Sequence, residues 1–153
     1  MTAYLLDVNV LVALMWPAHQ SHSQVENWFA DHARQGWATC PFTQAGFVRL
    51  VSTPAFSRDA VTPHEAIALL GANLKHRYHR SWGDEISLAE AVKGFQGRLV
   101  GHRQVSDAYL LGLAIYKGGK LATLDRSVVA LLPDGSPHRQ LVEIIGYTQR
   151  HDL

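Results

Sequence analysis

Three aspartates stand where an apolar run of the sequence ends or begins. Asp7 and Asp125 each follow a short apolar run, and Asp107 opens a long apolar stretch of helical character. In an open α/β sheet, the loops at the carboxyl ends of the strands form the binding crevice. Carboxylates gathered there repel one another unless a cation lies between them. The pattern therefore predicts a site for a hard divalent metal ion.

The ligand atoms of this predicted site are all oxygens. Cys40 is the only cysteine, and no histidine stands at an obvious ligand position beside the aspartates, so the set favours Mg²⁺ or Mn²⁺ over Zn²⁺. Mg²⁺ commonly keeps several waters and binds phosphate oxygens of a substrate. Such a site can activate water for in-line attack on a phosphodiester and stabilise the departing oxygen.

Each aspartate also has a purely structural interpretation. Asp7 or Asn9 can cap the helix that follows, because Asp and Asn are both favourable caps. Asp107 lies in the first turn of a predicted helix, where the helix dipole favours an acid, and Asp125 can begin a turn. The separations of 100 (107 − 7) and 18 (125 − 107) residues mean that only the fold can bring the three together.

The composition is that of one globular domain. The chain has 153 residues, of which 47% are apolar and 18% charged, and its formal net charge is +1. We therefore expect a single domain over residues 1–153, in which a polyanion would be held by a local Arg cluster and by metal. The single cysteine excludes an internal disulfide and fits a reducing cytoplasm. We expect neither a signal peptide nor a membrane span.

Short apolar runs alternate with helical patterns along the chain. Thr62, followed by Pro63 and Glu65, predicts a helix start, and Ser23 with Glu26 predicts another. The alternation predicts a three-layer α/β/α domain with a mostly parallel central sheet. The predicted strands are 4–6, 37–40, a short strand within 76–84, 121–124 and 141–145, and the predicted helices are 8–15, 23–35, 43–52, 62–74, 87–94, 107–117 and 127–131.

Four segments resemble the motifs of PIN-domain nucleases. LLDVNVL at 5–11 resembles the opening motif, an acid followed two residues later by Asn, Ser or Thr. VSDAYL at 105–110 resembles the third-acid motif and LATLDR at 121–126 the fourth. TQAGFVRL at 43–50 resembles the second motif of the VapC branch, the toxins of toxin–antitoxin pairs. Each motif is weak alone, whereas their order and spacing over nearly the whole chain are specific.

The resemblance implies a Mg²⁺- or Mn²⁺-dependent endoribonuclease. Asp7 and Asp107 would be direct metal ligands, and Asp125 a ligand directly or through water; the three would form the catalytic set. Asn9 would orient Asp7 or contact a substrate phosphate. The resemblance also implies an RNA substrate, a cognate VapB-type antitoxin that lies across the crevice, and a homodimer in the cytoplasm.

One position departs from the family pattern. The second motif usually supplies a Glu, and Gln44 stands near that position. An amide offers an oxygen but no charge, so a second divalent ion would bind more weakly. Asp84 or Glu85 could replace the missing charge. The favoured interpretation, however, is that both are solvated acids of a loop.

Two arginines and two histidines complete the candidates. Arg49 and Arg126 flank motif segments, so each is expected to bind the RNA backbone or, with equal weight, to pair with a site carboxylate. His76 and His79 have a spacing that can suit a metal, but no third ligand stands beside them and structural zinc is disfavoured.

Two other functions remain open from the sequence. A haloacid-dehalogenase-type phosphatase also has an acid after its first strand, but its motif needs a second acid where Asn9 stands, and no matching lysine lies between Asp7 and Asp125. A PIN-fold binding module with weak or no catalysis would fit the amide at Gln44. The RNA target, the number of metal ions and the antitoxin cannot be read from the sequence.

Overall fold

Five parallel strands form the centre of the molecule, in the order β3-β2-β1-β4-β5. The computed structural model describes residues 2–146. All four strand pairings are parallel, so every strand has its carboxyl end at the same edge of the sheet. The strands are β1 (Tyr4–Leu6), β2 (Trp37–Thr39), β3 (His79–Ser81), β4 (Lys120–Thr123) and β5 (Val142–Ile144).

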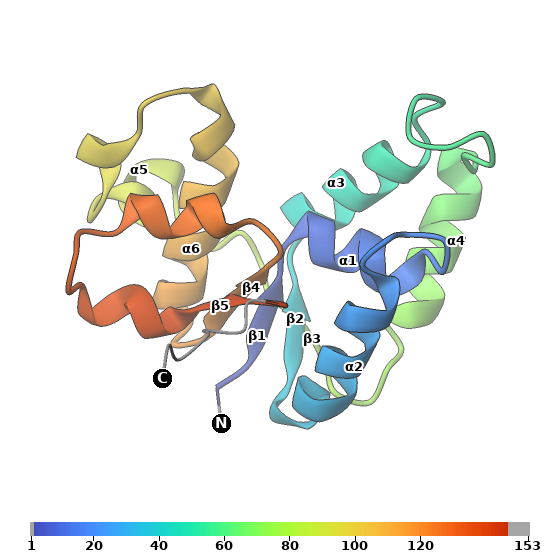
Figure 1. Cartoon of the computed structure of the whole chain (residues 1–153), viewed down its shortest axis with the longest axis horizontal. Coiled ribbons are helices and arrows are strands. Elements are labelled where there is room, and N and C mark those ends of the chain that lie inside the picture. Colours follow the sequence, from blue (N-terminus) through green and yellow to red (C-terminus); the bar gives the residue numbers. More distant parts are fainter. Residues whose placement is uncertain (1, 147–153) are drawn as a thin grey trace, which may run out of the picture.

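Helices cover both faces of this sheet, which gives the three layers that the sequence predicts (Figure 1). One face carries α1 (Val8–Met15), α2 (His22–His32), α3 (Pro41–Val51) and α4 (Pro63–Asn73). The other carries α5 (Leu88–Val92) and α6 (Val105–Tyr116). Short 3₁₀ segments link the elements: η1 (Ala33–Gln35), η2 (Gln96–Arg98), η3 (His102–Gln104), η4 (Arg126–Leu131) and η5 (Pro137–Leu141).

The central strand β1 is buried on both faces. Leu5 packs into the core beneath α5 and α6, whereas Tyr4 and Leu6 pack into the core beneath α1 to α4. Side chains of a strand alternate between the two faces of its sheet, so a three-residue apolar strand contributes to both cores. This double burial explains the continuous apolar run, which is typical of parallel sheets.

The chain reverses direction across the sheet at β1. It runs from β1 outward to β2 and β3, then returns to place β4 on the other side of β1. The carboxyl ends of β1 and β4 therefore lie at a topological switch point, where ligands bind in open α/β sheets. Asp7 follows β1, and Asp125 lies two residues beyond β4.

Most predicted elements are confirmed, and the corrections concern where two helices begin and the type of a third. The capping box at Ser23 is wrong, because α2 starts at His22 with Ser21 before it and no side-chain cap. The helix predicted from Thr43 begins at Pro41, which suits a first turn. The segment 127–131 lies in the 3₁₀ helix η4. Within residues 2–146, no helix has the length and apolar character needed to cross a bilayer.

Candidate functional site

Asp7 is a buried carboxylate at the junction of β1 and α1. Its side chain is 6% exposed. Oδ1 accepts a hydrogen bond from the Val8 backbone N–H at 2.7 Å, which caps α1, and Oδ2 accepts one from the Thr123 hydroxyl at 2.8 Å. Burial raises the pKa of Asp7, and the charge of Asp125 adds to that rise, whereas the two hydrogen bonds oppose it. The capping interpretation and the site interpretation are therefore both consistent with its position.

Thr123 connects the ends of β1 and β4, and sequence reasoning missed it. The fully buried hydroxyl donates to Asp7 and accepts from the Asn9 amide at 3.3 Å and from the Asp125 backbone N–H at 3.1 Å. One threonine thus fixes the position of two predicted site residues relative to a third. Its place as the last residue of a strand, two positions before an acid, is the signal that could have indicated it.

Asp107 lies in the first turn of α6, where the negative charges of Asp7 and Asp125 both act on its carboxyl group. Its pKa is raised to about 6, first because the carboxyl group is partly desolvated and then because Asp7 and Asp125 are negatively charged. No group within residues 2–146 donates a hydrogen bond to this carboxylate. Because Asp7 and Asp125 both act on Asp107, the fold has brought the three remote acids together.

Asp125 combines a turn with its place in the acidic group. Oδ1 accepts hydrogen bonds from the backbone N–H of Ser127 at 2.9 Å and from its hydroxyl at 2.7 Å. These bonds start η4, as the structural interpretation of this residue expects. The same residue raises the pKa of Asp7 and of Asp107.

Asp7, Asp107 and Asp125 offer the ligand atoms of a divalent-metal site, but their side chains do not form a complete coordination shell. The ligand atoms are carboxylate oxygens, and the mutual repulsion is what a bound cation would relieve. Among the described residues, no three His, Cys, Asp or Glu side chains are grouped closely enough to hold an ion as they stand. Water and substrate oxygens would therefore have to complete the coordination, as is usual for Mg²⁺.

Asn9 lies at the site but is engaged by β4. Its amide donates to Thr123, and its carbonyl oxygen accepts from the Leu124 backbone N–H at 3.2 Å. Asn9 therefore acts on Asp7 indirectly, since both residues bind the same threonine hydroxyl. This arrangement supports an orienting role more than direct contact with a phosphate.

Gln44 lies in the first half of α3, beside the end of β2. Its amide nitrogen donates to the buried Thr39 hydroxyl at 2.9 Å. A Cβ built on Gly46, two residues on, would meet Val8 Cγ2 at 2.7 Å, so α3 packs directly against the start of α1. Gln44 therefore stands at the same sheet edge as Asp7, where the sequence predicts it.

The remaining candidates divide between two surroundings. Arg49 is exposed on α3 and, within residues 2–146, forms no ion pair with a site carboxylate; Arg126 follows Asp125 at the start of η4. Asp84 accepts a hydrogen bond from the Tyr109 hydroxyl at 2.5 Å, and Glu85 pairs with Lys117 at 3.2 Å. Burial is the main cause of the raised pKa of Cys40, the residue before α3, and the charge of Asp84 adds to that rise, so Asp84 lies near the start of the helix that carries Gln44.

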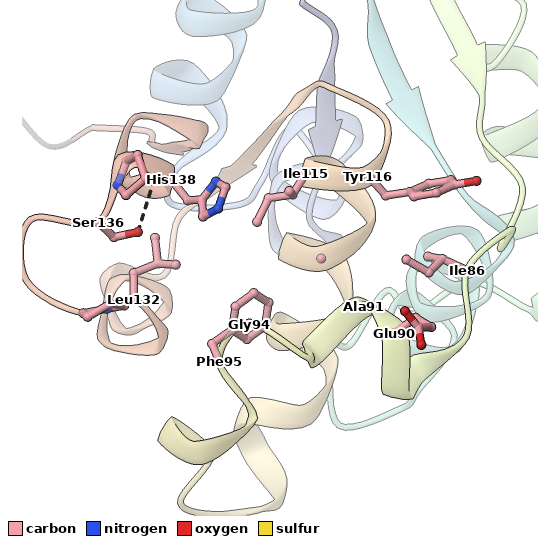
Figure 2. Close-up of a pocket in the computed structure, with 13 residues that line it drawn as sticks. Ile86, Glu90, Ala91, Gly94, Phe95, Ile115, Tyr116, Leu132, Ser136 and His138 are labelled. Atoms are coloured by element: carbon pink, nitrogen blue, oxygen red, sulfur yellow. Dashed lines mark hydrogen bonds between the residues drawn. The ribbon is translucent and has the colours of Figure 1, made fainter.

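A separate cavity of about 420 Å³ lies against α5, α6 and η5, and it is not this site (Figure 2). Its lining is mainly apolar, with Phe95, Ile115 and Leu132 among the residues drawn, and none of the three aspartates contributes. His138 and Ser136 lie at its rim, where the Ser136 hydroxyl accepts from the His138 backbone N–H. The cavity offers no cluster of acids for phosphodiester chemistry.

Known proteins resemble this chain in sequence and in fold. It is 41% identical over 145 residues, which are 95% of this chain and 100% of the relative, to Ribonuclease VapC39 of Mycobacterium tuberculosis. No protein-family model matches the chain.

Two solved structures share the fold at low sequence identity. One is Mycobacterium tuberculosis VapC20, a toxin that cleaves the sarcin–ricin loop, with a TM-score of 0.60, 16% identity and coverage of 83% of this chain and 93% of that one. Another is VapBC2 from Rickettsia felis bound to a fragment of its promoter, with a TM-score of 0.58, 15% identity and coverage of 81% and 89%. The fold, the acidic sheet edge and the sequence identity agree, and the chain belongs to the VapC ribonucleases, the PIN-domain toxins.

Proposed function

We propose that the sheet edge around Asp7, Asp107 and Asp125 is the active site of a Mg²⁺- or Mn²⁺-dependent endoribonuclease formed by one domain. The observation that carries this proposal is the position of Asp7 and Asp125 at the carboxyl ends of the adjacent strands β1 and β4, where both bind the Thr123 hydroxyl. Asp107 lies near enough to both acids for their charges to add to the rise of its pKa that partial burial causes. Three carboxylates that destabilise one another in this way favour a bound cation. The identity to a protein named as a ribonuclease supports RNA as the substrate.

The three carboxylates would hold the ion, with Asp125 binding directly or through water. A bound ion would supply Lewis-acid chemistry at this edge, which lowers the pKa of water and offsets charge on a phosphate. Thr123 and Asn9 keep Asp7 in place, and the Gln44 amide offers hydrogen bonds at the same edge. Arg49 and Arg126 are proposed to bind the RNA backbone on either side of the reacting phosphodiester.

The reaction adds water to phosphorus and breaks the bond to the ribose O3′. The O3′ leaves with a proton, so one product ends in a 3′-hydroxyl and the other begins with a 5′-phosphate. The 2′-hydroxyl is not the nucleophile. A product ending in a 2′,3′-cyclic phosphate would therefore be incompatible with the proposal.

The test compares the wild type with Asp107→Asn, both purified and supplied with Mg²⁺ or Mn²⁺. Loss of a metal ligand should lower the cleavage rate by more than the ~10–100-fold typical of a residue that only supports one. Chelation should stop wild-type cleavage, and sequencing of RNA ends should give 5′-phosphates. An Asp107→Asn variant as active as the wild type would refute this active site. The PIN fold would then carry either a catalytic site elsewhere or a binding function.

We further propose that the protein is the toxin of a pair, restrained by a VapB-type antitoxin, and acts as a homodimer in the cytoplasm. The low-identity relative from Rickettsia felis is described with its partner as VapBC2, which supports this partnership by analogy. Co-expression with the product of a neighbouring antitoxin reading frame should restore growth. Sedimentation of the purified toxin alone should give twice the mass of one chain.

A further inference from the structure

A partly buried hydrogen-bond relay leads from β3 to the sheet edge of the proposed site. The Nε2 atom of His79 lies 2.8 Å from the Thr39 hydroxyl oxygen. Thr39 is fully buried, and its oxygen also lies 2.9 Å from the amide nitrogen of Gln44. These contacts join a residue of the proposed site to a histidine on β3.

The directions of these hydrogen bonds follow from the orientation of the Gln44 amide. Its nitrogen donates to the Thr39 oxygen, so the Thr39 hydroxyl keeps its own hydrogen for the other partner that the described residues offer, His79 Nε2. Nε2 then accepts, and in neutral His79 the ring hydrogen is carried by Nδ1. The Oε1 atom of Gln44 points away from Thr39.

The relay ends at the same sheet edge as the acids. Tyr4 and Leu5 pair with Trp37 and Ala38, so one further step along both strands places Thr39 beside the residue before Asp7. The bond to Thr39 directs the amide nitrogen of Gln44 back towards the sheet. The oxygen atom is therefore the end that remains for the crevice.

We propose that Thr39 and His79 are positioning residues that fix the Gln44 carboxamide with its oxygen, and not its NH₂ group, presented to the reacting water. An acceptor at this place orients the water towards phosphorus. This inference rests on the proposed nuclease function, because it assigns a task to Gln44 in that reaction.

The surroundings of His79 favour its neutral form. Partial burial lowers the pKa of His79, the bond to Leu74 opposes this effect, and the nearby His76 ring lowers the pKa further. His76 accepts a hydrogen bond from the Trp37 indole N–H at 3.1 Å, and the Trp37 ring packs 4.6 Å from the His79 ring, centroid to centroid. The neutral ring is the state that the relay needs.

A carboxylate at position 44 would reverse the relay. A carboxylate only accepts hydrogen bonds, so the Thr39 hydroxyl would have to donate to it. His79 Nε2 would then have to carry a hydrogen and donate it to the Thr39 oxygen, and the added negative charge at position 44 would favour the charged imidazolium. Gln44 and the neutral His79 are therefore matched to each other.

The first measurement is the protonation of His79, by nitrogen NMR of the imidazole ring. The wild type should show the Nδ1–H tautomer at neutral pH, and Gln44→Glu should raise the pKa of His79 above its wild-type value. In the double variant Gln44→Glu with Thr39→Val, most of that rise should disappear. An Nε2–H tautomer in the wild type, or a His79 that does not respond to Gln44→Glu, would overturn the relay.

The second measurement is single-turnover RNA cleavage by folded variants. Thr39→Val should lower the rate of the chemical step by about 10–100-fold, as is typical for residues that orient an active-site group, with little change in RNA affinity. Thr39→Ser keeps the hydroxyl and should restore most of the rate. Equal rates for Thr39→Val and the wild type would refute the positioning role. An inactive wild type with the expected His79 tautomer would instead count against the nuclease proposal.

Discussion

Asp7 and Asp107 carry like charges in unlike surroundings. Asp7 is nearly enclosed but receives two hydrogen bonds, from Val8 and Thr123. Asp107 is half-buried and receives no hydrogen bond within the described part of the chain, so its charge is the less compensated of the two. A cation at this edge would therefore gain most from contact with Asp107.

Asp107 should make the metal-free protein less stable as the pH rises. Its pKa is about 6 in the fold against an ordinary 3.8, so the folded state holds a proton that the unfolded chain has released. The stabilisation is complete below pH 3.8 and is lost as the pH rises through 6. We expect the melting temperature in chelator to fall over this range by more for the wild type than for Asp107→Asn.

Mg²⁺ should reverse this difference at neutral pH. With the ion present, the wild type should gain melting temperature and Asp107→Asn should gain little, because the ion replaces the proton as the compensating charge. Identical melting curves of the two proteins in chelator from pH 4 to 7 would contradict the assigned pKa.

Thr123 should be needed for both stability and cleavage. Thr123→Val removes the donor to Asp7 and the acceptor for Asn9 and for the Asp125 backbone. Buried polar groups left without partners cost about 1–3 kcal/mol each, so we expect urea unfolding to show a loss in this range. Cleavage should fall with it, and Thr123→Ser should recover both properties. A Thr123→Val protein of wild-type stability would show that water replaces the hydroxyl.

The helix α6 is positioned by a close approach to α5. A Cβ added to Gly112 would collide with the backbone carbonyl of Ala91. No flexible side chain can move aside there, since the obstacle is backbone. The contact sets the distance of α6 from its neighbour and so places Asp107 in its first turn.

Gly112→Ala should therefore destabilise the fold. Forcing a methyl group into a packed contact typically costs about 1–3 kcal/mol, and the shift of α6 should also reduce cleavage. The matched control is Gly71→Ala in α4, where a Cβ meets nothing within 4 Å and alanine should stabilise the helix by about 0.5–1 kcal/mol. Urea unfolding of both variants tests this, and equal stability of the two would refute the close contact as a constraint.

The types of the elements were predictable because the spacing of apolar residues and the capping residues at helix ends agree with the fold. Thr62 caps α4 through the Glu65 backbone N–H, as the local pattern implies. Ser23 carries a similar pattern but lies inside α2, because the helix begins one residue earlier, at His22, with Ser21 as its N-cap. The local sequence marks Thr123 only as a strand end before an acid, whereas its bonds to Asp7 and Asn9 join residues more than 100 positions apart and depend on the fold.

At the scale of the molecule, an open groove adjoins the site. It has a volume of about 610 Å³ between α3 and α4, and both Gln44 and Arg49 line it. Ile67 lies on its wall and is 58% exposed. An apolar groove that ends beside a basic and a polar residue suits a peptide segment with apolar anchors, such as the proposed antitoxin.

Ile67→Asp should weaken antitoxin binding without changing the toxin's own cleavage. Loss of one apolar anchor should reduce affinity by at least about 10-fold, measured by titration calorimetry with the cognate antitoxin. The control is Ala72→Asp, which alters an exposed position of α4 that does not line the groove. Equal losses in both variants would point to a general charge effect, and no loss in either would place the antitoxin elsewhere.

The order of the strands has a consequence for the moment at which toxicity begins. The central strand β1 is made early, but its neighbour β4, which brings Thr123 and Asp125, is translated only after β2, β3 and the helices α1 to α6. A nascent chain that ends before Lys120 lacks Thr123 and Asp125, and with them one wall of the proposed active site. We therefore expect chains terminated before Lys120 to be unable to cleave RNA.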